Sequence, residues 1–403
     1  MDRAAVVPQA PLGIAREGGS ELYLPAALPK GPGPAHRASV FYNPAMALSR
    51  DLTLAVAVEE SRRLGRRLEV WDALAATGVR AIRLLRETEA VARVVATDAN
   101  PEVVEVLERN AVLEGSGRLI PECRDLRGGD PTLRFDLVEL DPYGTPQPFL
   151  PSALRATKEG GILGVTATDM AVLAGPERAT CLQRYGGRTV RGYLSREAGL
   201  RLLLAHLASV ARDQGRQTRP LLSYVGGYYV RTFVRVEPAP LEGGNTGGGD
   251  GAGSTPLIPL VGPVPYEGYS GPPLPDKGPV GPMWLAPLHD PEFARSLRPP
   301  AQPGSGPKVS RFLEFAAEEV RISVPFYYET GPLSRALGLA SPPPRPLILE
   351  ALREQGWESC RTHASPSGWR TMAPYPEVAR IVSGIRWGAA HAPEARAGPE
   401  LPS

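Results

Sequence analysis

The sequence predicts an α/β fold built on a doubly wound, largely parallel sheet. Between residues 68 and 167, short apolar runs typical of strands alternate with segments of helical spacing. Such β–α alternation is typical of a parallel sheet with helices on both faces. Two later strand-like runs flank Gly226-Gly227, a hairpin turn signature. The hairpin predicts an antiparallel pair at one edge of the sheet.

Each expected element follows from its local pattern of apolar residues. Leu48, Leu52 and Val58 recur at helical spacing, so a helix is expected over 47–64. Strands are expected at 68–73, 91–97, 119–123, 135–140, 161–167, 221–225 and 228–236. Helices are expected near 79–89, 101–114 and 148–157, and a longer helical region extends to about 215.

Composition divides the chain into five parts. A Pro- and Gly-punctuated lead-in covers residues 1–38, with a short hairpin expected near 21–24 and no chemistry assigned to it. The sheet domain takes 39–237, and a Gly-rich linker takes 238–256. A smaller α+β C-terminal domain over 257–390 is expected to hold helices at 308–320, 333–338 and 346–355 and a hairpin of 357–363 with 368–372, an order that resembles a winged helix. Residues 391–403 form a tail.

Composition also excludes several classes of protein. No apolar run approaches the roughly 20 residues that cross a bilayer, and the N-terminus lacks the apolar core of a signal peptide. A cytoplasmic location is therefore expected, with no membrane partner. Cys123, Cys181 and Cys360 are far apart and form no Cys-x-x-Cys pair. Neither a disulfide framework nor a metal site is expected.

Basic residues gather in one stretch although the net charge is only +2. Of 45 basic residues 41 are arginine, an excess that a high-GC genome would also produce. Between Arg178 and Arg235 lie eleven arginines and two acids, a balance of +9. The stretch is typical of a nucleic-acid footprint, and a solvated helix face remains the alternative. Candidate RNA contacts are Arg184, Arg188, Arg191, Arg361, His363, Arg370 and Arg386.

The step Asp141-Pro142-Tyr143 follows the apolar run 135–140 and suits an enzyme that holds a flat nucleobase. Asp141 and the Pro142 carbonyl can each accept a hydrogen bond from an exocyclic amine. Pro142 has no N–H to compete, and Tyr143 offers a face for stacking. Asp-Pro is also a common turn opener, so the motif alone leaves both interpretations open.

Acidic residues at successive strand ends predict a cofactor site. Asp72 ends the first strand and leads into a small-residue loop that contains Gly78. Asp98 lies twenty residues after Gly78, where an acid can bind both hydroxyls of an adenosine ribose. Asp125, after the third strand, could receive the adenine amine. With no pyrophosphate cradle, S-adenosylmethionine fits better than NAD, although any one of these acids could be an ordinary helix cap.

Together these residues resemble one known family, the tRNA (guanine-26-N2)-dimethyltransferases, which have a Rossmann-like methyltransferase sheet. The resemblance spans about 40 to 385. The matching motifs are Phe41-Tyr42-Asn43-Pro44, Arg50-Asp51, residues 72–80, Asp141-Pro142-Tyr143-Gly144, residues 161–169, Tyr185-Gly186, residues 281–285, Arg361-Thr362-His363 and Ser365-Pro366.

The resemblance implies a role for particular residues. It implies cofactor contacts by Arg50, Arg80, Asp98 and Asp125, with the Leu126 backbone beside the adenine. It also implies that Asp141 is the catalytic carboxylate and that Phe41 and Tyr143 stack on the base. Family members often carry phenylalanine where this chain has Tyr143. Some members carry a cysteine-based zinc site after the sheet domain, but that stretch is cysteine-free here, so no zinc is expected.

The expected function is dimethylation of the guanine 26 amine in tRNA, with the base flipped out of the stack. A neighbouring guanine is left open as a second target, and no obligate protein partner is indicated. One alternative keeps the chemistry and acts on another RNA, DNA or a protein glutamine. A second alternative is a non-catalytic RNA-binding protein, which the intact Asp98, Asp125 and Asp141 disfavour.

Overall fold

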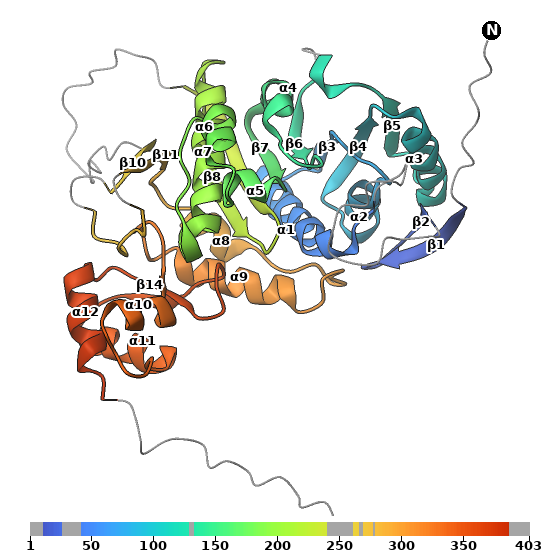
Figure 1. Cartoon of the computed structure of the whole chain (residues 1–403). Coiled ribbons are helices and arrows are strands. Elements are labelled where there is room, and N and C mark those ends of the chain that lie inside the picture. The colour runs from blue at the N-terminus through green and yellow to red at the C-terminus, as the bar shows by residue number, and fades with distance from the viewer. Residues whose placement is uncertain are drawn as a thin grey trace, which may run out of the picture.

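A seven-stranded sheet organises the computed structural model, which describes residues 11–25, 42–128, 133–239, 261–265, 269–276 and 279–386 (Figure 1). The strand order is β5-β4-β3-β6-β7-β9-β8. The strands are β3 (Leu68–Asp72), β4 (Val91–Asp98), β5 (Leu119–Cys123), β6 (Phe135–Leu140), β7 (Thr157–Ala167), β8 (Arg216–Val225) and β9 (Val230–Pro238). Strands β3 to β7 are mutually parallel, and β9 is antiparallel to both β7 and β8. The predicted doubly wound sheet with a closing hairpin is confirmed.

Helices cover both faces of this sheet and form two large cores. One face packs against α4 (Leu150–Ala156), α5 (Met170–Leu173), α6 (Arg178–Tyr185) and α7 (Ser195–Arg212). The other packs against α1 (Ala47–Leu64), α2 (Val79–Glu87) and α3 (Pro101–Glu114). Local signals set the ends of α3, where the Asn100 side chain accepts from the Glu102 N–H at 3.0 Å and Gly115 ends the helix at φ +82°. Short 3-10 turns are η1 (Pro44–Met46), η2 (Leu126–Gly128), η3 (Gln147–Phe149) and η4 (Gly192–Leu194).

The N-terminal segment forms a longer hairpin than expected. It consists of β1 (Leu12–Glu17) and β2 (Ser20–Pro25), and Leu22 and Leu24 are buried in the core beside α2. The hairpin lies on the opposite side of the molecule from the C-terminal helices (Figure 1). Part of the lead-in is therefore an integral piece of the sheet domain.

A smaller core at the C-terminus surrounds the buried Trp369. Its elements are β12 (Tyr328–Glu329), α10 (Thr330–Ala336), α11 (Arg345–Glu354), β13 (Ser359–Arg361), β14 (Gly368–Thr371) and α12 (Tyr375–Gly384). The three strands form a sheet in the order β12-β14-β13. The expected helices followed by a hairpin are present, whereas α12 was not predicted.

The segment before that core packs on the large sheet. It contains β10 (Val261–Val264), β11 (Val280–Trp284), α8 (Pro291–Ser296) and α9 (Lys308–Glu319). Strands β10 and β11 share the core of α7, and α8 and α9 share the core of α1. The boundary expected at 257 therefore does not coincide with the division between the cores. No helix in the described ranges is long and apolar enough to cross a membrane.

Candidate active site

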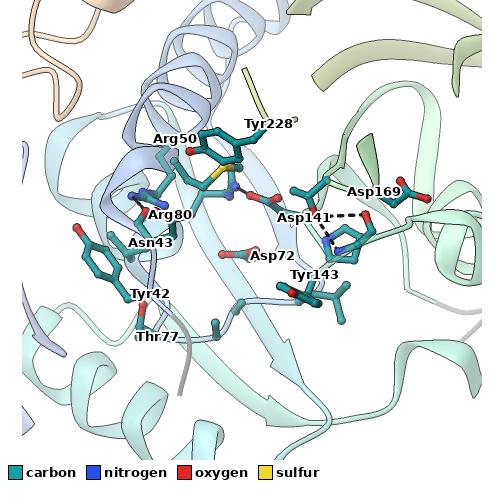
Figure 2. Close-up of a pocket in the computed structure, with 18 residues that line it drawn as sticks. Tyr42, Asn43, Arg50, Asp72, Thr77, Arg80, Asp141, Tyr143, Asp169 and Tyr228 are labelled. Atoms are coloured by element: carbon teal, nitrogen blue, oxygen red, sulfur yellow. Dashed lines mark hydrogen bonds and ion pairs between the residues drawn. The ribbon is translucent and has the colours of Figure 1, made fainter. Parts of the chain in front are cut away.

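A cavity of about 390 Å³ opens at the carboxyl edge of the sheet, between β3 and β6 (Figure 2). The strand order reverses at this point, since β4 and β5 lie on one side of β3 while β6 and β7 lie on the other. Ligands of doubly wound folds bind at such a switch point. The walls are formed by Tyr42, Asn43, Met46, Arg50, Asp72, Leu74, Ala75, Ala76, Thr77, Val79, Arg80, Asp141, Pro142, Tyr143, Gly144, Thr168, Asp169 and Tyr228.

Asp72 forms the floor of the cavity at the end of β3. Its side chain is buried, and Oδ2 has no hydrogen-bond partner among the described residues. Burial raises the pKa of Asp72 to about 7; Arg80 opposes the shift, and the carboxylates of Glu139 and Asp141 add to it. A buried, unpaired carboxyl facing a cavity is suited to a positively charged ligand group.

The loop from β3 to α2 lines the cavity and takes unusual backbone conformations. Gly78 begins α2 at φ +75°, and a Cβ there would lie 2.3 Å from the Leu107 Cδ1. Ala76 also has a positive φ of 47°, and its N–H points to the Asp98 Oδ2 at 3.3 Å. The buried Thr77 hydroxyl has no partner in the described part of the chain. Such strained loops often occur at functional sites.

Asp141 stands beside this loop, directly after β6. One of its oxygens, Oδ2, accepts from the Arg80 guanidinium. The other oxygen and the Pro142 carbonyl accept no hydrogen bond from any residue in the described ranges. Tyr143 is 59% exposed at the mouth of the cavity. Asp141, Pro142 and Tyr143 thus line the cavity together, and two of their acceptor oxygens are not used by other described residues.

Buried charges hold Arg80 in place beneath Asp141. Arg80 Nη1 donates to the Thr53 Oγ1 at 2.6 Å, and Arg231 Nη2 donates to the same oxygen at 2.9 Å. Arg231 is also paired with Glu139 at 2.6 Å, and Glu139 lies 3.5 Å from Arg80. Strands β6 and β9 therefore fix the orientation of Asp141 through α2. Neither Glu139 nor Arg231 had been singled out as a site residue.

The first hairpin reaches the cavity through Glu17, although no chemistry had been assigned to residues 1–38. Glu17 Oε1 accepts from the Arg50 Nε at 2.6 Å, and Glu17 Oε2 accepts from the Tyr42 hydroxyl at 2.6 Å. Arg83 lies 3.0 Å from the same carboxylate. The Arg50 and Arg83 guanidiniums and the Tyr42 hydroxyl outweigh burial and lower the pKa of Glu17. Glu17 therefore orients Arg50 at the cavity wall.

Asp169 closes the far side of the cavity after β7. The Tyr185 hydroxyl lies 2.9 Å from the Asp169 Oδ1 and 2.7 Å from the Thr145 Oγ1. Arg184, a candidate RNA contact, donates to the Asp169 Oδ2 at 2.8 Å. The Tyr185-Gly186 motif therefore anchors a wall of the site.

The structure brings together some of the predicted site residues. Six line the cavity: Arg50, Asp72, Arg80, Asp141, Pro142 and Tyr143. Gly78 and Asp98 adjoin the β3–α2 loop without lining the cavity. Asp125 lies one strand further, exposed and paired with Arg127 at 2.7 Å, and Leu126 is buried in the core. Phe41 lies outside the described residues.

The candidate RNA contacts fall into three groups. Arg188, Arg191 and Arg386 are exposed. Arg184 is half-buried and bonded to Asp169. Arg361 is half-buried and paired with Glu318 at 2.7 Å. Arg370 and His363 have buried side chains bonded to Glu197 and Glu319, so neither is available to an RNA in this structure. We therefore drop Arg370 and His363 from the RNA-contacting set.

Some arginines of the basic stretch are likewise internal. Arg201, Arg231 and Arg235 are buried and paired with Glu197, Glu139 and Glu60, respectively. Their charges are neutralised inside the protein. The balance of +9 read from the sequence therefore overstates the charge that this stretch presents to solvent.

A buried cluster of His289, Glu319 and His363 has the residue types of a metal site. The hydrogen bonds of the two histidines do not fit metal binding. The His363 Nε2 accepts from the Val225 N–H at 3.0 Å, and the His289 Nδ1 accepts from the Ser223 N–H at 3.3 Å. The ring nitrogens that face Glu319 therefore carry the protons. A metal-bound histidine shows the reverse pattern, donating its outer N–H to a second-shell acceptor.

The doubly wound sheet and its cavity, with a small-residue loop beside an Asp-Pro-aromatic step, define a class I methyltransferase. Within that class the chain belongs to a particular family. The family described as N2,N2-dimethylguanosine tRNA methyltransferase matches residues 33–247 and 276–383.

Similar proteins cover nearly the whole chain. A tRNA (guanine(26)-N(2))-dimethyltransferase from Thermococcus kodakarensis is 35% identical over 377 residues, which cover 86% of this chain and 94% of the relative. The enzyme of the same name from Pyrobaculum neutrophilum is 34% identical, covering 92% and 99%. The solved structure of Trm1 from Pyrococcus horikoshii with S-adenosyl-L-methionine has a TM-score of 0.76 at 29% identity, covering 92% of this chain and 100% of that one.

Proposed function

We propose that this protein is a tRNA (guanine-26-N2)-dimethyltransferase that uses S-adenosylmethionine. The observation that carries the proposal is that Asp141 and Pro142 line the same cavity as Asp72 and the β3–α2 loop. Family membership narrows the reaction to transfer onto a tRNA guanine.

The cavity fits S-adenosylmethionine at its buried, unpartnered polar atoms. Asp72 Oδ2 is placed to bind the ammonium of the cofactor, and the Thr77 hydroxyl offers a further hydrogen bond. Gly78 lets the start of α2 pack closely on Leu107, and Asp98 is the candidate for the ribose hydroxyls. The bound cofactor supplies an electrophilic methyl group. Arg50 remains a candidate contact, whereas Asp125 would have to exchange its bond to Arg127 to reach the adenine.

Asp141 and Pro142 make guanine N2 a usable nucleophile. The N2 lone pair is delocalised into the ring, so the amine must be oriented before it can attack. One N–H donates to the second Asp141 oxygen and the other to the Pro142 carbonyl, which directs the lone pair at the methyl group. The Asp141 carboxylate takes the proton as transfer proceeds. Arg80 keeps the carboxylate in this orientation.

The guanine is flipped into the cavity and stacks on Tyr143, whose ring is exposed at the mouth. Phe41 is the proposed second stacking partner. The second transfer requires space for a methylated amine between these rings.

Cofactor affinity is expected to depend on the ionisation of Asp72. Its pKa of about 7 leaves the carboxyl neutral at lower pH, so the affinity should rise from pH 5.5 to 7.5. Well below pH 7 the slope should approach tenfold per pH unit, while the cofactor amine stays protonated. Calorimetric titration with S-adenosylmethionine checks this expectation. Asp72→Asn should bind weakly with no such slope, and a flat profile for the unmodified protein would contradict the assignment.

The same ionisation affects stability with the opposite sign. The pKa of Asp72 is about 7 in the folded state and about 3.9 in the unfolded chain, so the folded state binds this proton more tightly. The unliganded protein should therefore lose stability from this group as pH rises from about 4 to 7.

Arg188 and Arg191 are proposed phosphate contacts. The Arg188 side chain makes no hydrogen bond or ion pair with other residues in the described ranges, and Arg191 lies 3.7 Å from Asp276. Replacing both with alanine should weaken tRNA binding and lower the slope of log affinity against log salt by about 1 to 2. The matched control is Arg109→Ala, because Arg109 lies on the exposed face of α3 at the other end of the sheet. An unchanged slope in the double variant would remove this surface from the proposal.

The test of the function is methyl transfer from labelled S-adenosylmethionine to an unmodified tRNA transcript. Label should enter the transcript and be lost when guanine 26 is replaced by adenine. Incorporation into ribosomal RNA or DNA instead would favour the alternative substrates. Cofactor binding without transfer to any of these acceptors would favour a protein glutamine or a non-catalytic role.

A further inference from the structure

Tyr228 lines the cavity, although the sequence had not identified it as a site residue. It lies in the turn between β8 and β9, where the Gly226 N–H donates to the Tyr229 carbonyl at 2.8 Å. The turn is tight: a Cβ on Gly226 would lie 2.8 Å from the Tyr224 Cε1. In Figure 2 the Tyr228 ring stands on the side of Arg50, and Tyr143 stands on the other side of Asp141.

The buried hydroxyl of Tyr228 has no hydrogen-bond partner in the part of the chain that the structure describes. Three buried polar atoms of the cavity wall lack a partner among the described residues: Asp72 Oδ2, Thr77 Oγ1 and the Tyr228 hydroxyl. The first two lie on the β3–α2 side of the cavity, which is proposed above to bind the cofactor. Leaving a buried hydroxyl unsatisfied is costly, which indicates that its partner arrives with a ligand.

Several neighbouring donors of the wall already have partners. The Tyr42 hydroxyl is bound to Glu17, as are Nε and Nη2 of Arg50, and Arg80 is bound to Asp141 and Thr53. Burial raises the pKa of Tyr228 to about 12, so the phenol keeps its proton at neutral pH. Tyr228 therefore offers a hydrogen that no acceptor among the described residues takes, which leaves it available to an acceptor of a bound molecule.

The C-terminal elements hold the hairpin that carries Tyr228. The Val225 N–H donates to the His363 Nε2, and His363 in turn contacts Glu319 through Nδ1 at 2.9 Å. The Tyr224 ring stacks on His363 at 5.8 Å between centroids and contacts Tyr229 at 5.3 Å. The turn is thus fixed from both ends, so the Tyr228 hydroxyl is positioned before a ligand binds.

We propose that Tyr228 is a recognition residue of the active site, whose hydroxyl donates to an oxygen acceptor of a bound molecule. Two molecules carry such an oxygen: the accepting guanine, through its ring carbonyl, and the cofactor, through its carboxylate. This inference rests on the proposed function for the first acceptor and only on cofactor binding for the second. Holding the guanine carbonyl would present N2, rather than the ring nitrogen, to the methyl group.

The experiment compares Tyr228→Phe with the unmodified protein in two arms. One arm measures the Kd of S-adenosylmethionine by calorimetry. The other measures kcat/KM on tRNA transcripts that carry guanine or 2-aminopurine at position 26, because 2-aminopurine keeps the amine and lacks the carbonyl. A carboxylate acceptor predicts a rise in cofactor Kd of about tenfold to a hundredfold. If the guanine carbonyl is the acceptor, Tyr228→Phe should lower kcat/KM about threefold to tenfold on the guanine transcript. It should not lower kcat/KM on the 2-aminopurine transcript.

Tyr328→Phe is the matched control, because its hydroxyl is also buried and unpartnered within the described ranges but lies in the C-terminal core. Neither variant should lower the melting temperature, since each removes an unsatisfied hydroxyl. Unchanged affinity and kinetics for Tyr228→Phe in both arms would overturn the proposal. If the unmodified protein fails to methylate either transcript, the proposed function fails, while the cofactor arm still tests the second acceptor.

Discussion

Replacing Asp141 with alanine is expected to abolish methyl transfer while leaving S-adenosylmethionine binding intact. The variant loses both the acceptor that orients the amine and the group that takes its proton, and such a base is worth about 10² to 10⁴ in rate. Asp141→Asn should keep part of the activity, because its amide oxygen can still accept one N–H. Single-turnover transfer to tRNA and calorimetric cofactor titration measure the two properties separately.

The control for this result is Asp213→Ala, an exposed acid just after α7. It should match the unmodified protein in both assays. Near-normal turnover by Asp141→Ala would remove the carboxylate from the mechanism. A loss of cofactor binding in the same variant would instead show that Asp141 serves the cofactor site.

The largest expected effect on stability comes from Glu197, which joins α7 to the C-terminal core. Its buried carboxylate is paired with Arg201 at 2.8 Å and with Arg370 at 2.7 Å, and it accepts from the Phe326 N–H at 2.9 Å. Both guanidiniums are buried as well. Glu197→Gln should lower the free energy of unfolding by about 3–5 kcal/mol, because buried Arg201 loses its carboxylate partner and buried Arg370 keeps only Glu319, at 3.2 Å. Urea denaturation measures this change.

Arg370 and Arg201 together outweigh burial and lower the pKa of Glu197. The folded-state pKa then lies below the unfolded value, so the stabilisation is complete at neutral pH and is lost only as pH falls through the acidic range. Glu350→Gln, on the exposed face of α11, should change the unfolding free energy by less than about 0.5 kcal/mol. A similarly small change for Glu197→Gln would contradict the structural role.

Local patterns were sufficient to predict the sheet domain. The helix over 47–64 and the strands at 119–123 and 135–140 match α1, β5 and β6 residue for residue. Apolar periodicity and helix caps act within a few residues, so neighbouring residues determine where these elements begin and end. Strands β10 and β11 and helix α8 were not predicted, because their short segments are rich in proline and acquire structure by packing on the large cores.

Contacts between distant segments could not be predicted in the same way. Arg370 was taken for a surface cation, but its acidic partner Glu197 lies 173 residues away. Glu17 was passed over because Arg50 and Arg83 lie 33 and 66 residues beyond it. Tyr228 looked like the start of a strand until the turn placed it at the cavity. Asp72 and Asp141, at strand ends, were predictable because parallel strands gather their carboxyl ends at one edge.

Nucleoside mass spectrometry of a treated tRNA transcript tests the central claim most directly. The purified protein is incubated with S-adenosylmethionine that carries a deuterated methyl group, and the product is digested and mapped by position. We expect N2,N2-dimethylguanosine with two labelled methyl groups at position 26, and none in the reaction with Asp141→Ala. Label confined to a different nucleoside, or to guanines other than 26, would contradict the account.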